Sequence, residues 1–462
     1  MALSHMSYAG HARAVAVLGL PLIGGHLGQI AIGLTDTIML GRYSIEALAA
    51  MTTAGSLFFV LFLMGSGFAW AVMPMVASFD AEGDEISLRR ATRMGLWLST
   101  GFAVCALPAM IWSETLLLAT GQSAQVAADG AAYLKIAGWG LFPALIVMTF
   151  KSYLAALERT QIVLWITLLS ALTNGLANYA FIFGNWGAPE LGIEGAAIAS
   201  VATQIVSLIG IIAYALWALP EHGILVRLWR PDFDMLGRVF RLGWPIGLTS
   251  LSESGLFAAT AFMMGWFGNV ALAAHGIALQ LAAITFMVHL GLGNVATIRA
   301  GNAYGRHDLN HMKRGARTVI VLSLAMALAT IIVFLTVPEA LIGIFMDANQ
   351  EARAEVVAIG VVLLALAALF QLMDGAQVVA LGLLRGVQDA KVPMVLAAIS
   401  YWGIGMPTSY ILGYVMGWEG VGIWLGLVIG LACAGAALMY RYWYVMVPRL
   451  AAGDGTDAVP VS

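Results

Sequence analysis

The sequence predicts an all-α integral membrane protein with twelve transmembrane helices in two six-helix lobes related by a pseudo-two-fold axis. Three observations support this prediction: an apolar composition, twelve long apolar segments separated by short polar breaks, and an internal repeat. Of the 462 residues, 61% are hydrophobic and 10% are charged, whereas soluble domains have about 25% charged residues. The net charge of −3 gives no indication of nucleic-acid binding.

Twelve segments are long enough to cross a bilayer as helices, which takes about 20 apolar residues each. They cover residues 14–40, 46–78, 89–113, 126–153, 161–184, 193–219, 236–267, 270–301, 312–336, 353–384, 393–416 and 420–447. Several are longer than the bilayer requires, so we expect tilted helices or helices that extend past the lipid. A soluble all-helical protein would need charged helix faces, and these segments lack them.

The positive charges lie almost entirely on one side of the predicted spans. Nineteen of the 22 Lys and Arg residues fall on the side that contains Arg13, and only Arg42, Lys135 and Arg353 fall on the other. Because cytoplasmic loops carry an excess of Lys and Arg, we expect both termini in the cytoplasm. The sequence therefore predicts a multi-pass protein surrounded by membrane lipids.

An internal repeat relates the two halves of the chain. A shift of 224 residues without a gap places Gly19 on Gly243, Pro21 on Pro245, Gly41 on Gly265, Gly67 on Gly291, Asp84 on Asp308, Arg90 on Arg314 and Arg93 on Arg317. Each half then has six spans in the same orientation, which implies a pseudo-two-fold axis along the membrane normal. The predicted parts are an N-terminal lobe at 1–219, a cytoplasmic connector at 220–235, a C-terminal lobe at 236–447 and a flexible tail at 448–462.

Three acidic residues, Asp36, Glu253 and Asp374, lie deep inside apolar spans. A charge in this environment is unfavourable by a few kcal/mol and needs a functional or pairing reason. The repeat places Asp36 on Thr260 and Glu253 on Gln29, so the two halves carry charge at different positions. We would expect a purely structural carboxylate to be retained in both copies, and the difference favours a function for these acids.

Polar residues at helical spacing accompany the acids. Asn174 and Asn178 are four residues apart and share a helix face, and their carbonyl groups suit a protonated acid or Na⁺. Gln371 and Gln377 lie three residues on either side of Asp374 and share part of its face. The structural alternative for all of these groups is hydrogen bonding between helices without any part in transport.

Several motifs follow one another in a specific order over nearly the whole chain. They are GLPLIGGHLGQIAIGLTDTIMLGRY with Asp36, LTNGLANYAFIFG with Asn174 and Asn178, GWPIGLTSLSESGLFA with Glu253, and LFQLMDGAQVVALGLLRGVQDAK with Asp374. Together these motifs resemble the multidrug and toxic compound extrusion (MATE) family, specifically its NorM-type branch. One departure is Gly276 after His275, where the family often has Gln, so no substrate contact is carried over to this position.

The resemblance implies two six-helix lobes around a V-shaped central cavity. It also implies a monomeric exporter of organic cations, such as drugs and dyes, that works by alternating access and needs no cofactor other than inward H⁺ or Na⁺. Glu253, Asp374 and Asp36 would bind the coupling ion or proton. Residues expected to support that ion or the substrate cation are Asn174, Asn178, Ser200, Gln371 and Gln377. A bound Na⁺ is expected either at Glu253 and Asp374 or at Asp36, Asn174 and Asn178.

Two other functions compete with this interpretation. A flippase for a lipid-linked glycan shares the architecture but would need a strongly cationic cavity for phosphate, whereas the deep charges here are acidic. An intramembrane enzyme is disfavoured because the chain has no HExxH or GxSxG motif and its deep acids are spread over three helices. A GxxxxGK[ST] nucleotide loop is also absent from the sequence, which favours an ion gradient over ATP as the energy source.

Overall fold

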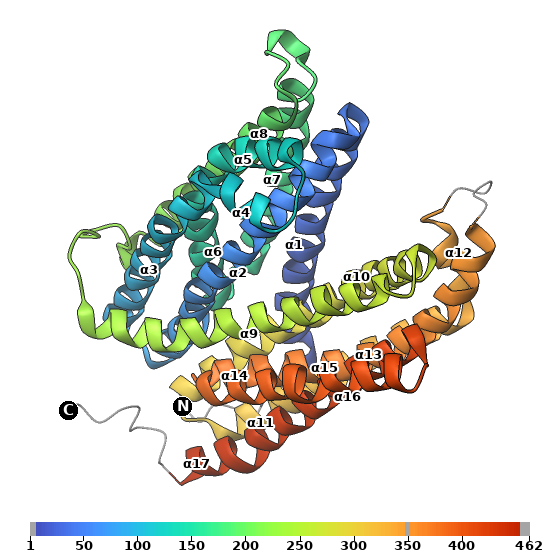
Figure 1. The fold of residues 1–462 in the computed structure, drawn as a ribbon. Coiled ribbons are helices and arrows are strands. Elements are labelled where there is room, and N and C mark those ends of the chain that lie inside the picture. The colour runs from blue at the N-terminus through green and yellow to red at the C-terminus, as the bar shows by residue number, and fades with distance from the viewer. Residues whose placement is uncertain (1–5, 347–351, 453–462) are drawn as a thin grey trace. The chain divides into compact units, whose positions relative to one another are not determined.

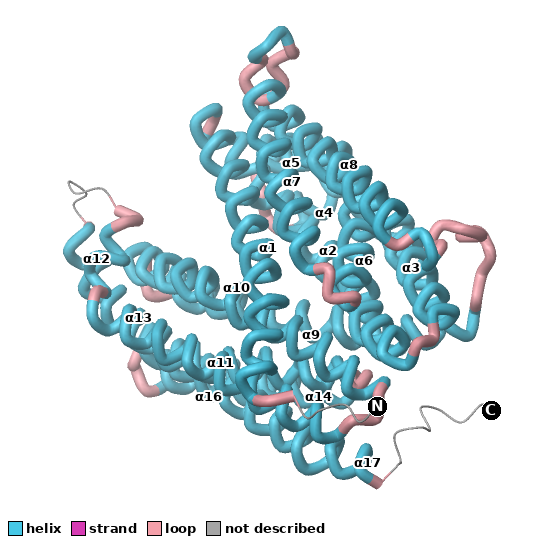
Figure 2. Tube along the Cα trace, turned by 180° about the vertical axis from the view of Figure 1, so that it is seen from behind, coloured by secondary structure: helices cyan, strands magenta, loops and turns pink. Residues whose placement is uncertain are grey.

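The computed structural model of this protein describes residues 6–346 and 352–452, and every regular element in that part of the chain is a helix. Figure 1 colours the helices along the chain, and Figure 2 shows them from behind with the connecting loops in pink. The prediction of an all-α protein is confirmed. A bilayer favours this outcome, because a helix satisfies its own backbone hydrogen bonds where no water is present.

The first half of the chain forms eight α-helices and three short 3₁₀ turns. The α-helices are α1 (Tyr8–Tyr43), α2 (Ile45–Glu82), α3 (Glu85–Ile111), α4 (Ser113–Ala119), α5 (Ala124–Ala137), α6 (Leu141–Ala156), α7 (Thr160–Phe181) and α8 (Gly192–Ala218). The 3₁₀ turns are η1 (Gly138–Gly140), which joins α5 to α6, η2 (Asn185–Gly187) and η3 (Pro220–His222).

The second half contains nine further α-helices and three π-helical stretches. The α-helices are α9 (Phe233–Gly265), α10 (Asn269–Gly305), α11 (Leu309–Thr336), α12 (Pro338–Gly343), α13 (Arg353–Gly386), α14 (Lys391–Ala398), α15 (Met406–Tyr410), α16 (Glu419–Tyr440) and α17 (Val447–Ala451). The π-helical stretches are η4 (Ile399–Gly405), η5 (Ile411–Val415) and η6 (Arg441–Met446).

Eleven helical segments among the described residues are long and apolar enough to cross a membrane, and each coincides with one predicted span. The remaining prediction, 236–267, coincides with α9. This helix has 33 residues, which gives a length of about 50 Å at 1.5 Å per residue and is sufficient for a span. It is less apolar than the other eleven because Glu253 and several Ser and Thr residues interrupt it. The protein is therefore a multi-pass membrane protein.

Contacts divide the described chain into two compact units whose boundaries fall inside helices. The N-terminal unit is Leu20–Leu248, and the C-terminal unit is the chain from Thr249 onward together with the chain up to Gly19. The predicted lobes, 1–219 and 236–447, instead placed all of α1 in the first lobe and α9 from residue 236 onward in the second. The predicted boundary was the polar connector, whereas the compact units depend on which helices the first parts of α1 and α9 contact.

Polar contacts hold the start of α1 in the C-terminal unit. Arg299 on α10 donates from Nη2 to His11 Nδ1 at 2.8 Å and to His311 Nε2 at 2.9 Å. Arg314 on α11 donates to the carbonyl oxygen of Met6 at 3.2 Å, and its guanidinium lies over the ring of Tyr8 at 5.8 Å. His11 is completely buried. These contacts explain why the first turns of α1 pack with the second half of the chain.

The predicted connector, 220–235, lies against α3 in the N-terminal unit. Arg93 donates to the carbonyl oxygens of Gly223 at 2.7 Å and Ile224 at 2.8 Å, and Trp97 Nε1 donates to Leu228 O at 2.7 Å. The connector is thus a fixed strap that leads into α9. The internal repeat pairs Arg90 on α3 with Arg314 on α11. Arg90 contacts the segment that enters α9, and Arg314 contacts the segment that enters α1.

Asp232 combines two roles at the end of this strap. Its carboxylate forms an ion pair with Arg90 and accepts the backbone N–H of Met235 at 3.1 Å, which caps the start of α9. The hydrogen bond from the Arg90 guanidinium, together with the Met235 amide and the positive charge of Arg90, lowers the pKa of Asp232 below its ordinary value of 3.8. The charged carboxylate of Asp232 therefore fixes the start of α9 through its contacts with Arg90 and the Met235 N–H.

The first half of α9 also contacts α2 backbone to backbone. A Cβ atom built on Gly67 would lie 2.4 Å from Gly247 N and 2.5 Å from Gly243 O. Only glycine fits at such an approach, and small residues are the usual means of bringing helices together in a membrane. This contact lies within the N-terminal unit.

The predicted flexible tail at 448–462 is only partly observed. Val447–Ala451 form the short helix α17, so the prediction is wrong for residues 448–451. Pro448 stands near the first position of this helix, where proline is well tolerated. The rest of the predicted tail, 453–462, lies outside the described residues.

Candidate functional site

Asp36 lies in a polar cluster of the N-terminal unit with both of its predicted asparagine partners. Asn174 and Asn178 on α7 donate from their Nδ2 atoms to Asp36 Oδ1 at 2.9 and 2.6 Å, and Asn178 also donates to Asn174 Oδ1 at 3.2 Å. Both asparagines are almost completely buried. Their spacing of four residues brings both amides to one face of α7, toward α1.

The amide NH₂ groups of both asparagines face the carboxylate and donate to it. Their carbonyl groups remain the predicted acceptors for a protonated acid or ligands for Na⁺. Asn178 Oδ1 has no hydrogen-bond partner among the described residues. Two donors on one carboxylate favour its ionised form. Burial of Asp36 favours its neutral form, so the two hydrogen bonds partly offset the cost of a charge at this position.

Ser200 is connected to Asp36 through one intermediate residue, Tyr133. Tyr133 on α5 hydrogen bonds with Ser200 on α8 and interacts electrostatically with Asp36. Tyr133 thus joins the predicted Ser200 to the cluster. Sequence reasoning did not find Tyr133, because α5 is distant from α1 in the chain and no spacing rule relates the two.

The C-terminal unit contains the second cluster, which joins α9 and α13. Gln377 Nε2 donates to Glu253 Oε1 at 2.9 Å, and Glu253 interacts electrostatically with Asp374. Asp374 is 1% exposed, and neither of its carboxylate oxygens has a hydrogen-bond partner among the described residues. A buried carboxylate without a donor is costly in its charged form. This group can be stabilised by a proton or by a small cation.

Gln371 does not contact Asp374 directly. Its Nε2 atom donates to the carbonyl oxygen of Ala282 on α10 at 3.0 Å, and its Oε1 atom has no partner among the described residues. Gln371 and Gln377 are both completely buried. Their free carbonyl oxygens and the Asp374 carboxylate form an oxygen-rich set of groups, which is the chemistry that suits H⁺ or Na⁺.

Two further charged or polar groups belong to this cluster. Arg385 near the end of α13 and Tyr401 on η4 both interact electrostatically with Glu253. The distribution of positive charge in the sequence places Arg385 on the cytoplasmic side. Only the packing of α9, α13 and η4 brings these two residues to the acids, and no sequence spacing indicates it.

Two membrane histidines have ordinary packing partners. His275 Nδ1 accepts a hydrogen bond from Trp424 Nε1 at 3.1 Å, and His289 Nδ1 lies 2.9 Å from Ser323 Oγ. Among the described residues, no group of three or more His, Cys, Asp or Glu side chains is placed to hold a metal ion.

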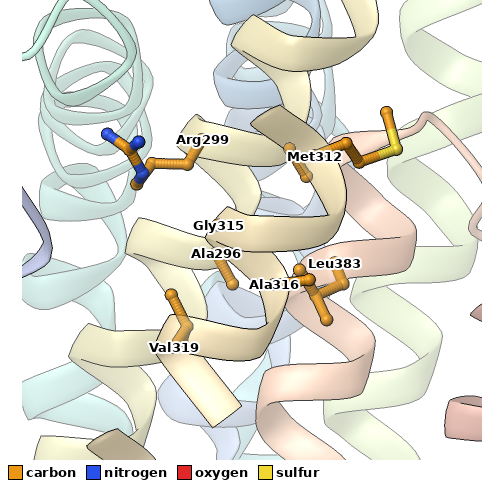
Figure 3. A pocket seen from close by; sticks show the side chains of 8 residues that line it. Ala296, Arg299, Met312, Gly315, Ala316, Val319 and Leu383 are labelled. Atoms are coloured by element: carbon orange, nitrogen blue, oxygen red, sulfur yellow. The ribbon is translucent and has the colours of Figure 1, made fainter. Parts of the chain in front are cut away.

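A pocket in the C-terminal unit is lined by residues of α10, α11 and α13, among them Ala296, Arg299, Gly315, Val319 and Leu383 (Figure 3). The labelled side chains are mostly small and apolar, and the Arg299 guanidinium is directed away from Leu383. The space is too small for a water molecule. It is a gap in helix packing, and the acidic clusters lie elsewhere.

Comparison with known proteins identifies the family and the relatives of the chain. The MatE family model matches residues 21–180 and 245–411. The chain is 41% identical over 448 residues to the probable multidrug resistance protein NorM of Rhizobium meliloti (strain 1021), covering 96% of each chain. It is 43% identical over 438 residues to the protein of the same name from Agrobacterium fabrum, covering 94% of each chain.

Solved structures show the same fold at low sequence identity. A crystal structure of the eukaryotic MATE transporter AtDTX14 matches with a TM-score of 0.85 at 17% identity, covering 98% of this chain and all of that one. The outward-facing structure of a multidrug resistance MATE family transporter matches with a TM-score of 0.84 at 18% identity, covering 95% and 96% of the two chains. From the matched family model and these relatives, the chain belongs to the MatE family, and it is a membrane transporter and not an enzyme.

Proposed function

We propose that this protein is a secondary active multidrug exporter of the bacterial inner membrane, exchanging organic cations for inward H⁺ or Na⁺ by alternating access. The observation that carries the proposal is Asp374, a carboxylate buried beside Glu253 that accepts no hydrogen bond from any residue that the structure describes. The NorM relatives, which are called probable multidrug resistance proteins, support the substrate class. We further propose that the protein works as a monomer in lipid, with both termini in the cytoplasm and no resident cofactor.

Exchange follows from competition for negative charge. Deprotonated carboxylates attract an organic cation that enters from the cytoplasm. Entry of H⁺ or Na⁺ from outside then neutralises the same acids and lowers their affinity for the organic cation, which is released outward. Since a ligand shifts an equilibrium only through its different affinity for the two states, the acids must be uncovered to each cation in turn. A phosphate-bearing lipid is a poor match for these acidic clusters, so we do not propose a flippase.

The test is transport of a fluorescent organic cation such as ethidium in proteoliposomes, under a pH gradient alone and under a sodium gradient alone. The wild-type protein is expected to export the dye under at least one gradient. Asp36→Asn, Glu253→Gln and Asp374→Asn are each expected to reduce gradient-driven export at least tenfold, because a neutral amide cannot exchange one cation for another.

A suitable control is Glu114→Gln, which neutralises an exposed acid on the short helix α4. It should transport at the wild-type rate, and equal amounts of each folded variant should be reconstituted. Full gradient-driven export by all three variants of the buried acids would refute the proposal, as would a wild-type protein that responds to neither gradient.

A further inference from the structure

Tyr401 is a buried polar group to which the proposed exchange assigns no role. Its side chain is completely buried, and its hydroxyl group has no hydrogen-bond partner among the described residues. An unpaired hydroxyl in an apolar interior costs free energy. Tyr401 lies in η4, one of the π-helical stretches, and such stretches often occur at functional sites. The hydroxyl is therefore expected to gain a partner in another state of the transport cycle.

The neighbouring residue attaches η4 to the helix that carries Glu253. Trp402 Nε1 donates to Ser252 Oγ at 2.9 Å and to Ser252 O at 3.2 Å, and Ser252 directly precedes Glu253. The Trp402 ring also lies over Gly255, where an added Cβ would come within 3.1 Å of Cζ2. Glycine at 255 allows this close approach. The contact holds Tyr401 beside the turn of α9 that presents Glu253.

The electrostatic neighbours of Tyr401 are both acids of the cluster, Glu253 and Asp374, together with Arg385. Two nearby amide donors are already used, since Gln377 Nε2 donates to Glu253 and Gln371 Nε2 donates to the backbone of α10. Within the described part of the chain, the hydroxyl of Tyr401 thus has no acceptor, and the carboxylate of Asp374 in the same cluster has no donor.

We propose that Tyr401 is a positioning residue for cation exchange, whose hydroxyl donates to the Asp374 carboxylate when the acid pair is empty and is displaced when H⁺ or Na⁺ binds. This inference rests on the proposed function and adds a residue to its site. A hydrogen bond to an ionised carboxylate stabilises the empty, charged state. Tyr401 therefore competes with the incoming cation and promotes its release.

Removal of the hydroxyl is expected to tighten cation binding. In Tyr401→Phe, the empty carboxylate loses its donor, so the concentration of H⁺ or Na⁺ that gives half-maximal exchange should fall about tenfold, the effect of losing one charge-assisted hydrogen bond. The exchange rate is measured in proteoliposomes over a pH series without sodium and over a sodium series at constant pH. Tyr401→Leu provides a second variant without the hydroxyl and is expected to shift in the same direction.

The matched control is Tyr442→Phe. Tyr442 lies in η6, another π-helical stretch of the same unit; it is also completely buried, and its hydroxyl also has no partner among the described residues. Burial alone affects its hydroxyl, without the nearby acids that surround Tyr401. Loss of a buried hydroxyl as such would change both variants equally, so a shift restricted to Tyr401→Phe identifies contact with the acid pair.

The outcomes separate the inference from the function on which it rests. If wild-type exchange depends on neither ion, the proposed function fails. If wild-type exchange depends on an ion but Tyr401→Phe gives the same half-maximal concentration as Tyr442→Phe, the role of Tyr401 alone is refuted. A higher half-maximal concentration in Tyr401→Phe would also overturn it, since the hydroxyl would then be a ligand of the cation and not its competitor.

Discussion

The chemistry of a buried carboxylate depends on the donors around it, and the two acidic clusters differ in this respect. Asp36 accepts two amide hydrogen bonds, from Asn174 and Asn178, whereas Asp374 accepts none from the described residues. Burial favours the neutral form of both acids, and the two amide donors partly offset this effect at Asp36. The two clusters are expected to bind the same ion with different affinities.

Removing one donor from Asp36 should make this residue easier to protonate. In Asn178→Leu, which keeps the volume of the side chain but removes its NH₂ group, the pH of half-maximal proton-driven exchange should rise by about one unit, since one hydrogen bond to an ionised group contributes about 1.5 kcal/mol. Asn185→Leu, which removes only a hydrogen bond to the Tyr179 carbonyl near the end of α7, is the control. A half-maximal pH that is unchanged or lower in Asn178→Leu would contradict this role.

The residues of the site were only partly predictable from the sequence. Asp36, Glu253 and Asp374 were predicted from the cost of charge in an apolar span, and the asparagines from their spacing on one helix face. Whether an amide offers its NH₂ or its carbonyl group depends on local geometry, which the spacing of the asparagines does not determine. Tyr133 and Tyr401 reach the acids through tertiary packing, which leaves no pattern in the sequence.

At the scale of the helix, the two halves of α9 differ. Its second half carries Glu253 and was recognised from a run of apolar residues that contains one acid. Its first half begins at Phe233, inside the stretch predicted to be a connector, where the Asp232 cap and the Arg90 ion pair fix its start. The cap is local, but the ion pair depends on a partner 142 residues away in the chain and is not visible in local sequence.

The Arg90 and Asp232 ion pair should make stability depend on acidity. Because the folded protein has a lower pKa at Asp232 than the ordinary value of 3.8, the pair stabilises the fold fully above that value. The stabilisation is lost as the pH falls through the folded pKa. Asp232→Asn should therefore lower the thermal midpoint at pH 7, and the difference from wild type should shrink below about pH 4.

Thermal unfolding in detergent at a series of pH values measures this difference. Asp234→Asn is the control, because Asp234 lies farther from Arg90, at 3.7 Å, and its side chain is 78% exposed. If the difference between Asp232→Asn and wild type persists unchanged in acid, the ion pair does not account for the loss of stability. The hydrogen bond from the Met235 N–H to residue 232 would then account for it.

The contact between α2 and α9 gives a second prediction at this scale. Gly67→Ala should destabilise the N-terminal unit, because the added Cβ would lie 2.4 Å from the backbone of α9 and the helices would have to separate. The thermal midpoint should fall by several degrees. Gly55→Ala on the same helix meets nothing within 4 Å and should be neutral or slightly stabilising, since alanine favours a helix over glycine. Equal midpoints for the two variants would contradict the contact.

At the scale of the whole molecule, composition and hydropathy predicted the number and order of the spans. These signals are strong because a bilayer requires long apolar helices and excludes most charge. The division of the chain into compact units depends in addition on which helices the starts of α1 and α9 contact. The polar contacts of His11 and of the connector determine this division, and they join residues far apart in the sequence.

The central claim is that one set of buried acids carries organic cations and coupling ions in turn. It is tested most directly by reverse exchange, in which an imposed gradient of organic cation alone drives H⁺ or Na⁺ across proteoliposomes in the opposite direction. We predict such a counter-flux for the wild-type protein and at least a tenfold smaller one for the combined variant Asp36→Asn, Glu253→Gln and Asp374→Asn. A wild-type protein that carries the organic cation without any opposing ion flux, or a combined variant with undiminished counter-flux, would contradict the claim.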